Sequence, residues 1–333
     1  LRRHNMSMKI NNHSLSSLRA FCSAIPRFFT LSLLRHFMPR NNNKRFPLLN
    51  YTQFNYNWAM LETRPSIAEL QEIAKKLRRY VITMTAAAGS GHPGGSLSAA
   101  DIITALYFKV MRHDPKNPNW QDRDRFVLSK GHAAPVLYAA LAECGYFPVE
   151  ELLTLRKLDS RLQGHTDRTL TPGIEMSAGA LGQGLSFSIG IALAGKLDSR
   201  DYHVYVLLGD GECDEGQVWE AAMSAAHFKV DNLTAIVDRN RQQLDGYCCD
   251  IMSLEPLTDK WRAFGWQVIE VDGHNLNQIL NALAKTKETK GKPSVIIAHT
   301  IKGKGVSFME YNIDFHGKAP TPEEAERALK ELA

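Results

Sequence analysis

Apolar side chains follow two alternating patterns along the chain from residue 67 onward. A spacing of three or four positions predicts an amphipathic helix over 67–88, with a face made of Ile67, Leu70, Ile73, Leu77 and Val81. Short continuous apolar runs, typical of strands buried on both faces, lie at 125–128, 203–208, 233–238, 266–271 and 294–298. Further helices are predicted at 97–111 (with Ser96 as its N-cap), about 135–143, 148–157, 179–196, 215–228, 258–264 and 276–287. The alternation predicts an α/β fold with a doubly wound, mostly parallel sheet and helices on both faces.

The first 61 residues differ from the rest of the chain. They contain nine Lys and Arg residues and no Asp or Glu, and they are rich in Asn and Ser. This composition resembles an organelle transit peptide, and it also fits a signal peptide or a start codon assigned too far upstream. We expect residues 1–61 to form a basic, disordered N-terminal extension. Residues 62–333 are expected to form one domain.

Net charge and cysteines exclude several classes of function. The whole chain carries +5, but residues 62–333 hold 31 basic and 35 acidic side chains, so the expected domain is mildly acidic and gives no reason to expect nucleic-acid binding. No run of 18 uncharged apolar residues predicts a membrane span. The five cysteines have no zinc-site spacing, which favours reduced thiols in a cytoplasmic protein.

A glycine-rich turn between the second predicted strand and its helix carries the clearest chemistry. Gly209 and Gly211 let backbone N–H groups approach a phosphate, and the following helix N-terminus favours an anion. Asp210 between them suits a divalent cation that bridges to phosphate oxygens; we expect Mg²⁺, with Ca²⁺ or Mn²⁺ as alternatives. Asn240, which follows the next strand, and the carbonyl of Gln242 would supply further oxygens.

Four histidines lie in glycine-containing loops, where a helix or strand ends. They are His92, His132, His165 and His316. Their spacing does not match a zinc hydrolase motif, and no nearby cysteine completes a zinc ligand set. Neutral imidazole suits hydrogen bonds to sugar hydroxyls and proton transfer at a carbonyl.

Motifs across residues 67–320 resemble those of the transketolase family, which has the thiamine-diphosphate-binding fold. They lie at 90–94, 129–132, 182–184, 209–211, 243–246 and 302–305. The resemblance implies that thiamine diphosphate and its cation are the cofactors. It implies metal ligation by Asp210, Asn240 and Gln242. It implies cofactor contacts from His132, Gly179, Leu181, Gly211, Asn240 and His316. It assigns catalytic roles to His92, His165, His316 and Glu215, the last in a glutamate cluster that includes Glu220 and links the cofactor sites of a dimer.

Full-length members of this family are about twice as long as this chain. By the resemblance, the glutamate that activates the cofactor and the arginines that grip the sugar phosphate come from the missing second domain. We therefore expect an N-terminal subunit that needs a separate C-terminal subunit, in a homodimeric or α2β2 assembly. The implied reaction transfers a two-carbon ketol unit from a ketose phosphate to an aldose phosphate, with the pentose phosphate pathway as the default setting.

Other interpretations remain open from the sequence. The chain could belong to another thiamine-diphosphate enzyme, such as a deoxyxylulose-phosphate synthase or the α-subunit of an α-ketoacid dehydrogenase. It could also be a non-catalytic cofactor-binding relative. The sequence of residues 212–215 and the four loop histidines argue against the two other enzymes. Asp210, Asn240 and the histidines argue against a non-catalytic relative. A nicotinamide enzyme is disfavoured because no G-x-G-x-x-G follows the first strand.

Overall fold

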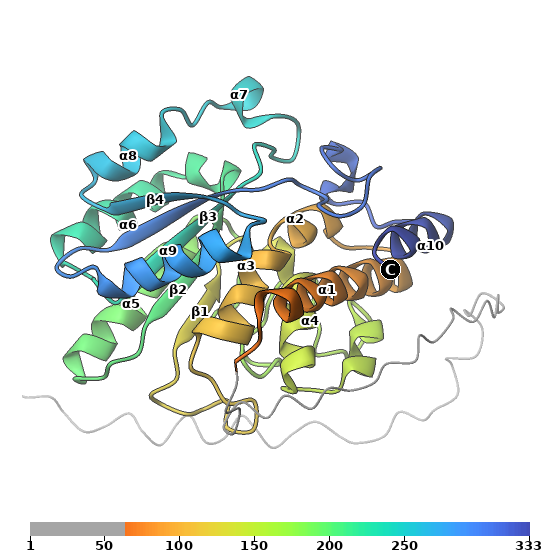
Figure 1. Cartoon of the computed structure of the whole chain (residues 1–333), viewed down its shortest axis with the longest axis horizontal. Coiled ribbons are helices and arrows are strands. Elements are labelled where there is room, and N and C mark those ends of the chain that lie inside the picture. Colours follow the sequence, from red (N-terminus) through yellow and green to blue (C-terminus); the bar gives the residue numbers. More distant parts are fainter. Residues whose placement is uncertain (1–63) are drawn as a thin grey trace, which may run out of the picture. The chain divides into compact units, whose positions relative to one another are not determined.

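A five-stranded parallel sheet organises the chain in the computed structural model, which describes residues 64–333 (Figure 1). Its order is β1-β2-β3-β5-β4, and every neighbouring pair is parallel. The strands are β1 (Arg125–Leu128), β2 (Val204–Gly209), β3 (Leu233–Arg239), β4 (Gln267–Asp272) and β5 (Ser294–His299). The predicted strands and their parallel arrangement are confirmed. The predicted extension at 1–61 lies outside the described residues.

Helices cover both faces of this sheet, as the sequence predicts. On β2, Tyr205 and Leu207 pack in one core, and Val204, Val206 and Leu208 pack in a second core. The first core is shared with α1, α3 (Ala100–Ala105), α4 and α9, and the second with α5, α6 and α8. Successive residues of a strand point to opposite faces, so a continuous apolar run can supply both cores. The longer helices are α1 (Ile67–Ala88), α4 (Ala134–Cys144), α5 (Gln183–Leu197), α6 (Gly216–His227), α8 (Leu257–Ala263), α9 (Leu276–Glu288) and α10 (Pro322–Glu331).

The predicted helix at 97–111 is wrong in its start and its continuity. The structure has two short helices, α2 (Pro93–Ser98) and α3 (Ala100–Ala105), followed by a π-helical turn over Leu106–Val110. Ser96 is not an N-cap, because it lies inside α2 and its hydroxyl donates to the carbonyl of His92 at 2.8 Å. Pro93 occupies the first turn of α2, where its missing N–H costs nothing, so the helix can begin earlier than the apolar pattern indicates.

Two further elements differ from the sequence pattern. The predicted helix at 148–157 is a 3-10 helix over Val149–Thr154. Helix α10 was not predicted, although Thr321 and Glu324 form a capping box and Pro322 opens the helix. Helix α10 packs against α1 (Figure 1). A further short helix, α7, spans Cys248–Ile251. No helix of residues 64–333 is long and apolar enough to cross a membrane.

The strand register brings the functional loops together at one edge. Gly209 of β2 pairs with Asp238 of β3, and Arg239 pairs with His299 of β5. The segments that follow these three strands therefore leave the sheet side by side, which is where ligands of open parallel sheets bind.

Candidate active site

Asp210 lies at the carboxyl end of β2, at the entrance to a 3-10 turn (Gly211–Asp214) that leads into α6. Its carboxylate accepts hydrogen bonds from the backbone N–H of Gly211, at 2.9 Å, and from the backbone N–H of Arg241. The second bond joins it to the segment after β3. Burial, and secondarily the charge of Asp238, raise the pKa of Asp210 to about 6. A buried carboxylate with a raised pKa would be stabilised by a cation.

Two other predicted metal ligands lie next to this carboxylate. Asn240 immediately precedes Arg241, and its side-chain oxygen accepts from the N–H of Gln242 at 3.1 Å. The backbone carbonyl of Gln242 accepts from Lys302 Nζ at 3.4 Å. The side-chain oxygen of Gln242 is buried and has no hydrogen-bond partner among residues 64–333. The structure thus brings Asp210, Asn240 and Gln242 together.

The chemistry of these donors fits a hard cation. Carboxylate, amide and carbonyl oxygens are the ligands that Mg²⁺ takes together with phosphate oxygens. Residues 64–333 contain no group of three or more His, Cys, Asp or Glu that could hold a metal by itself, so a cation here would depend on the mixed oxygen set.

Gly211 allows the loop after β3 to pack closely against the turn after β2. A Cβ at this position would lie 2.8 Å from Cβ of Gln243, closer than real Cβ atoms approach. The loops after β2 and β3 can therefore approach each other only because residue 211 has no side chain. The phosphate contact that the sequence predicts for Gly211 remains a prediction.

The four predicted histidines gather into one cluster at the same edge. The ring centroid of His92 lies 5.4 Å from His132, 6.0 Å from His165 and 5.8 Å from His316. His132 and His316 stack at 5.1 Å. His132 and His316 lie in short 3-10 helices (Gly131–Ala133 and Ile313–His316), His92 directly precedes α2, and His165 lies in a loop and is the exposed member.

Burial and nearby cations keep these rings neutral. Burial, followed by the charge of Arg156, lowers the pKa of His92 to about 4. Burial and Lys302 lower the pKa of His316 to about 3, and burial and Lys130 hold the pKa of His132 well below its usual value. Neutral rings can accept as well as donate hydrogen bonds near pH 7, which suits contact with a hydroxylated substrate.

The sequence did not predict that Lys302 contacts both the histidine cluster and the loop after β3. It is buried, and its Nζ lies 2.7 Å from Nδ1 of His316 and 3.4 Å from the carbonyls of Gln242 and Gln243. Burial, followed by the charge of Lys130, lowers the pKa of Lys302 to about 8. The motif at 302–305 was noted in the sequence, but the partners of Lys302 come from other loops.

A buried ion pair between Lys130 and Asp238 was also missed. Asp238, near the end of β3, accepts from Lys130 and from the hydroxyls of Ser98 (2.6 Å) and Thr300. Lys130 also donates to the carbonyl of Gly95 at 3.1 Å. The signal was an acidic residue at the end of an otherwise apolar strand.

Glu212 clamps the glycine turn to the loop before α5. Its carboxylate accepts from the N–H groups of Gly209 and Gly182, each at 2.9 Å, and from the hydroxyl of Ser129. Burial raises its pKa. Glu212 was not among the predicted site residues, although it lies within the motif.

The other predicted site residues lie near the protein surface, in the loop before α5 and at the start of α6. Gly179 is exposed and Leu181 half-buried in the loop before α5, and a Cβ at Gly182 would lie 2.8 Å from Cβ of Glu215. Glu215 is exposed at the start of α6, together with Glu220 on the same helix. The roles of these residues remain predictions.

Arg156 joins the histidine cluster from the loop after the 3-10 helix at Val149–Thr154. Its guanidinium donates to the hydroxyl of Ser90 at 2.7 Å and lies 3.4 Å from Nδ1 of His92. A Cβ at Gly164 would collide with this guanidinium at 2.9 Å. The resemblance to transketolases placed the arginines that bind the sugar phosphate outside this chain, and no motif singled out Arg156.

Comparison with known proteins identifies the class. The family described as "Transketolase, thiamine diphosphate binding domain" matches residues 70–332. Fold and site therefore define a thiamine-diphosphate-binding α/β domain of an enzyme. The chain is 49% identical to SqwG, a subunit of the 6-deoxy-6-sulfo-D-fructose transketolase of Clostridium sp. (strain MSTE9), over 79% of this chain and 96% of that protein. It is 45% identical to one of the subunits of the apulose-4-phosphate transketolase of Phocaeicola vulgatus, over 80% of this chain and 93% of that protein.

A solved structure gives the same result. The crystal structure of transketolase from Campylobacter jejuni superimposes with a TM-score of 0.76 at 35% identity, over 80% of this chain and 43% of that one. The chain belongs to the transketolase family, and it corresponds to the N-terminal, cofactor-binding subunit of transketolases built from two kinds of chain. These relatives favour a transketolase over the other thiamine-diphosphate enzymes that the sequence left open.

Proposed function

We propose that this transketolase subunit binds Mg²⁺-thiamine diphosphate at the carboxyl edge of its sheet and works together with a separate C-terminal subunit. The two would transfer a two-carbon ketol unit from a ketose to an aldose. The pairing is supported by two relatives that are named as subunits and are matched over more than nine-tenths of their length. A cytoplasmic location and an α2β2 or dimeric assembly belong to the same proposal.

The observation that carries the cofactor assignment is the bond from the backbone N–H of Arg241 to the carboxylate of Asp210. It joins the ends of β2 and β3, so Asp210, Asn240 and the carbonyl of Gln242 would hold the cation. Gly211 would let the diphosphate approach the turn, and Gly179 and Leu181 would line the cofactor. When bound, the cofactor supplies the carbon nucleophile that accepts the ketol unit.

The histidines would orient the substrate and move its protons. His132 and His316 would face the diphosphate, with His316 also facing the substrate, and His92 and His165 would bind donor hydroxyls and the carbonyl. Their lowered pKa values leave them neutral. In His92 and His316, Nδ1 faces a donor, the guanidinium of Arg156 or the ammonium of Lys302, so Nε2–H is the group that would donate to the substrate. Glu215 would act through the glutamate cluster between two copies.

The substrate would be an anionic sugar. The two relatives are named for a sulfonated sugar and for a sugar phosphate, which supports a negative group distant from the reacting carbonyl. Sugar phosphates of carbohydrate metabolism, including the five-carbon ones, are the default donor and acceptor. Because closely similar subunits carry names for different sugars, we expect the C-terminal partner to contribute to the choice.

Reconstitution tests this proposal. The purified chain should transfer no ketol unit by itself, and adding the C-terminal partner with thiamine diphosphate and Mg²⁺ should produce transfer between a ketose phosphate and an aldose phosphate. His92→Ala should lower kcat/KM about 100-fold, because a positioned acid–base group contributes about that factor or more. His227→Ala, at an exposed histidine on α6, is the matched control. Robust transfer by the chain alone would contradict the two-subunit proposal.

A further inference from the structure

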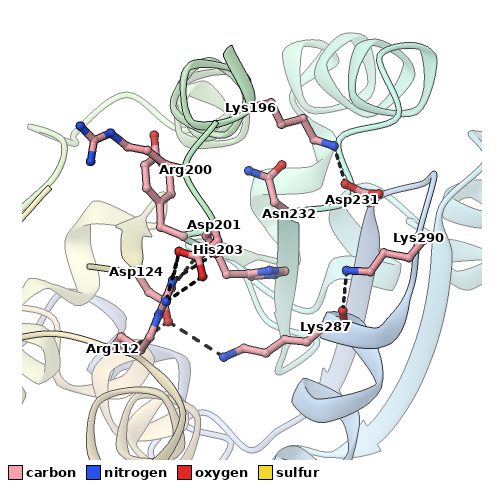
Figure 2. Close-up of a pocket in the computed structure, with 11 residues that line it drawn as sticks. Arg112, Asp124, Lys196, Arg200, Asp201, His203, Asp231, Asn232, Lys287 and Lys290 are labelled. Atoms are coloured by element: carbon pink, nitrogen blue, oxygen red, sulfur yellow. Dashed lines mark hydrogen bonds and ion pairs between the residues drawn. The ribbon is translucent and has the colours of Figure 1, made fainter. Parts of the chain in front are cut away.

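A cavity of about 500 Å³ lies at the amino edge of the sheet, where the chain enters the strands, and Asp210 lies at the other edge. Figure 2 shows the side chains that line this cavity. Its walls are the segments that lead into the strands. Arg112 and Asp124 precede β1, Lys196 lies in the last turn of α5, and residues 200–203 lead into β2. Asp231 and Asn232 precede β3, and Lys287 and Lys290 lie where α9 ends before β5. This volume is in the range of small-molecule sites. The proposed cofactor site does not use any of these residues.

Positive charge dominates the cavity wall. Five cationic side chains and three carboxylates line the cavity, and one of the cations, Arg200, pairs at 2.6 Å with Asp122 outside the wall, which leaves an excess of one positive charge. The cations are Arg112, Lys196, Arg200, Lys287 and Lys290, and the carboxylates are Asp124, Asp201 and Asp231. His203 adds no charge near neutral pH, because burial lowers its pKa to about 4.

Each of the three carboxylates forms ion pairs or hydrogen bonds within the protein. Asp124 accepts from the backbone N–H groups of Arg112 and His203, each at 2.9 Å, and pairs with the Arg112 guanidinium. Asp201 also pairs with Arg112. Asp231 pairs with Lys196 and accepts from the N–H of Gly291 at 2.8 Å.

Two lysines of the cavity wall are paired with carboxylates more weakly than the other cations. Lys287 Nζ lies 3.4 Å from the carbonyl of Val110 and 4.0 Å from the nearest oxygen of Asp124. Lys290 Nζ donates to the carbonyl of Lys287 at 3.2 Å, and no salt bridge within residues 64–333 pairs it with a carboxylate. Figure 2 shows both lysines bordering the same hollow as Arg112 and Lys196. Both side chains are exposed, so water solvates their ammonium groups, and an anion placed between them would add charge-assisted hydrogen bonds that the carboxylates of the protein do not supply.

We propose that this cavity binds the phosphate group of a small metabolite, at a site separate from the cofactor edge. Lysine is a common point-charge ligand of phosphate, and Lys287 and Lys290 would hold one dianion between them. The carboxylates on the wall disfavour a long polyanion such as nucleic acid, which would have to pass them. The site does not depend on the proposed function, since none of its residues belongs to the carboxyl edge.

Titration calorimetry of the full chain with inorganic phosphate and with glycerol 3-phosphate, without divalent cation, tests the proposal. One saturable site is expected, and Lys290→Gln should weaken it at least tenfold. Lys285→Gln, at an exposed lysine of α9 that does not line the cavity, should leave binding unchanged. Tighter binding of glycerol 3-phosphate would identify a phosphomonoester, and equal binding would identify free phosphate; both support phosphate recognition.

Two results would overturn the proposal. One is the absence of saturable binding to the unmodified chain. The other is binding that survives Lys290→Gln and is lost in Lys302→Met, because that pattern would place the phosphate at the carboxyl edge. Lys290 is an exposed side chain, so its replacement should not disturb folding, and the thermal unfolding midpoint of each variant without ligand checks this.

Discussion

Buried charge is the feature that sets apart the individual residues at the carboxyl edge. Asp210, Asp238, Lys130 and Lys302 are all nearly inaccessible to solvent, where an unpaired charge is costly. Proteins retain such groups where partners or ligands compensate them. Here the partners are backbone N–H groups for Asp210, and a lysine with two hydroxyls for Asp238.

Replacing Asp238 with Ala should destabilise the protein strongly. It would leave the ammonium of Lys130 buried without its carboxylate, and breaking a buried pair in this way costs about 3–5 kcal/mol. Urea unfolding measures the change. Asp259→Ala, which removes an exposed i,i+3 pair with Arg262, should cost less than about 0.5 kcal/mol. Similar losses in the two variants would contradict the assigned role of burial.

His92 should make the stability depend on pH. Its pKa is about 4 in the folded chain and 6.5 when unperturbed, so between these values the unfolded chain binds a proton that the folded chain does not. Stability therefore falls as the pH drops from 6.5 toward 4. Full linkage would cost about 2 kcal/mol at pH 5, and partial solvent access reduces this to about 1 kcal/mol.

Urea unfolding of the unmodified chain and of His92→Asn at pH 7 and pH 5 checks this dependence. The variant should lose less stability on acidification than the unmodified chain. His227→Asn, at an exposed position, is measured in parallel. An equal loss in the unmodified chain and His92→Asn would show that His92 is not the group responsible.

Among the elements, helix α5 approaches the end of β1 through Gly184. A Cβ at Gly184 would lie 2.4 Å from the side chain of Ser129, whereas a Cβ at Gly190 on the same helix would meet nothing within 4 Å. Gly184→Ala should therefore cost about 1–3 kcal/mol through overpacking. Gly190→Ala should gain about 0.5–1 kcal/mol through helix propensity.

The unfolding free energies of these two variants test whether α5 packs closely against Ser129, since both variants make the same chemical change in one helix. A loss confined to Gly184→Ala would support the close approach of α5 to Ser129. Equal effects of the two substitutions would refute it.

The inner strands were predictable from the sequence because they are buried on both faces. Each of them is then a continuous apolar run, and the predicted and observed bounds differ by about one residue, as for 203–208 and β2 (Val204–Gly209). Helices at loop-rich positions were less predictable. Helix α2 begins at Pro93, earlier than the apolar pattern predicts. Helix α10 is amphipathic, and its capping box of Thr321 and Glu324 is a start signal that the sequence already contains.

The candidate site was predictable in part for a similar reason. Asp210, Asn240 and the four histidines stand out because each lies in a glycine-rich turn or at a strand end. Lys302, Arg156 and Glu212 do not, because their partners come from distant loops and a charged loop residue is usually solvated. Only the assembled sheet edge distinguishes them.

Over the whole molecule, the described residues combine one sheet with two edges of different character. The carboxyl edge collects neutral histidines around a buried carboxylate, and the amino edge collects cations around a cavity. The first fits a diphosphate held through a metal ion, because Asp210 would otherwise repel it. The central claim is therefore that cofactor binding requires both the cation and this one carboxylate.

Calorimetric titration of thiamine diphosphate into the chain with its C-terminal partner, with Mg²⁺ and with excess chelator, tests that claim most directly. The account predicts tight binding with Mg²⁺, a loss of at least 100-fold with chelator, and the same loss in Asp210→Ala whether or not Mg²⁺ is present. Asp214→Ala, at an exposed aspartate in the same turn, should bind like the unmodified chain. Unchanged, Mg²⁺-dependent binding by Asp210→Ala would contradict the account.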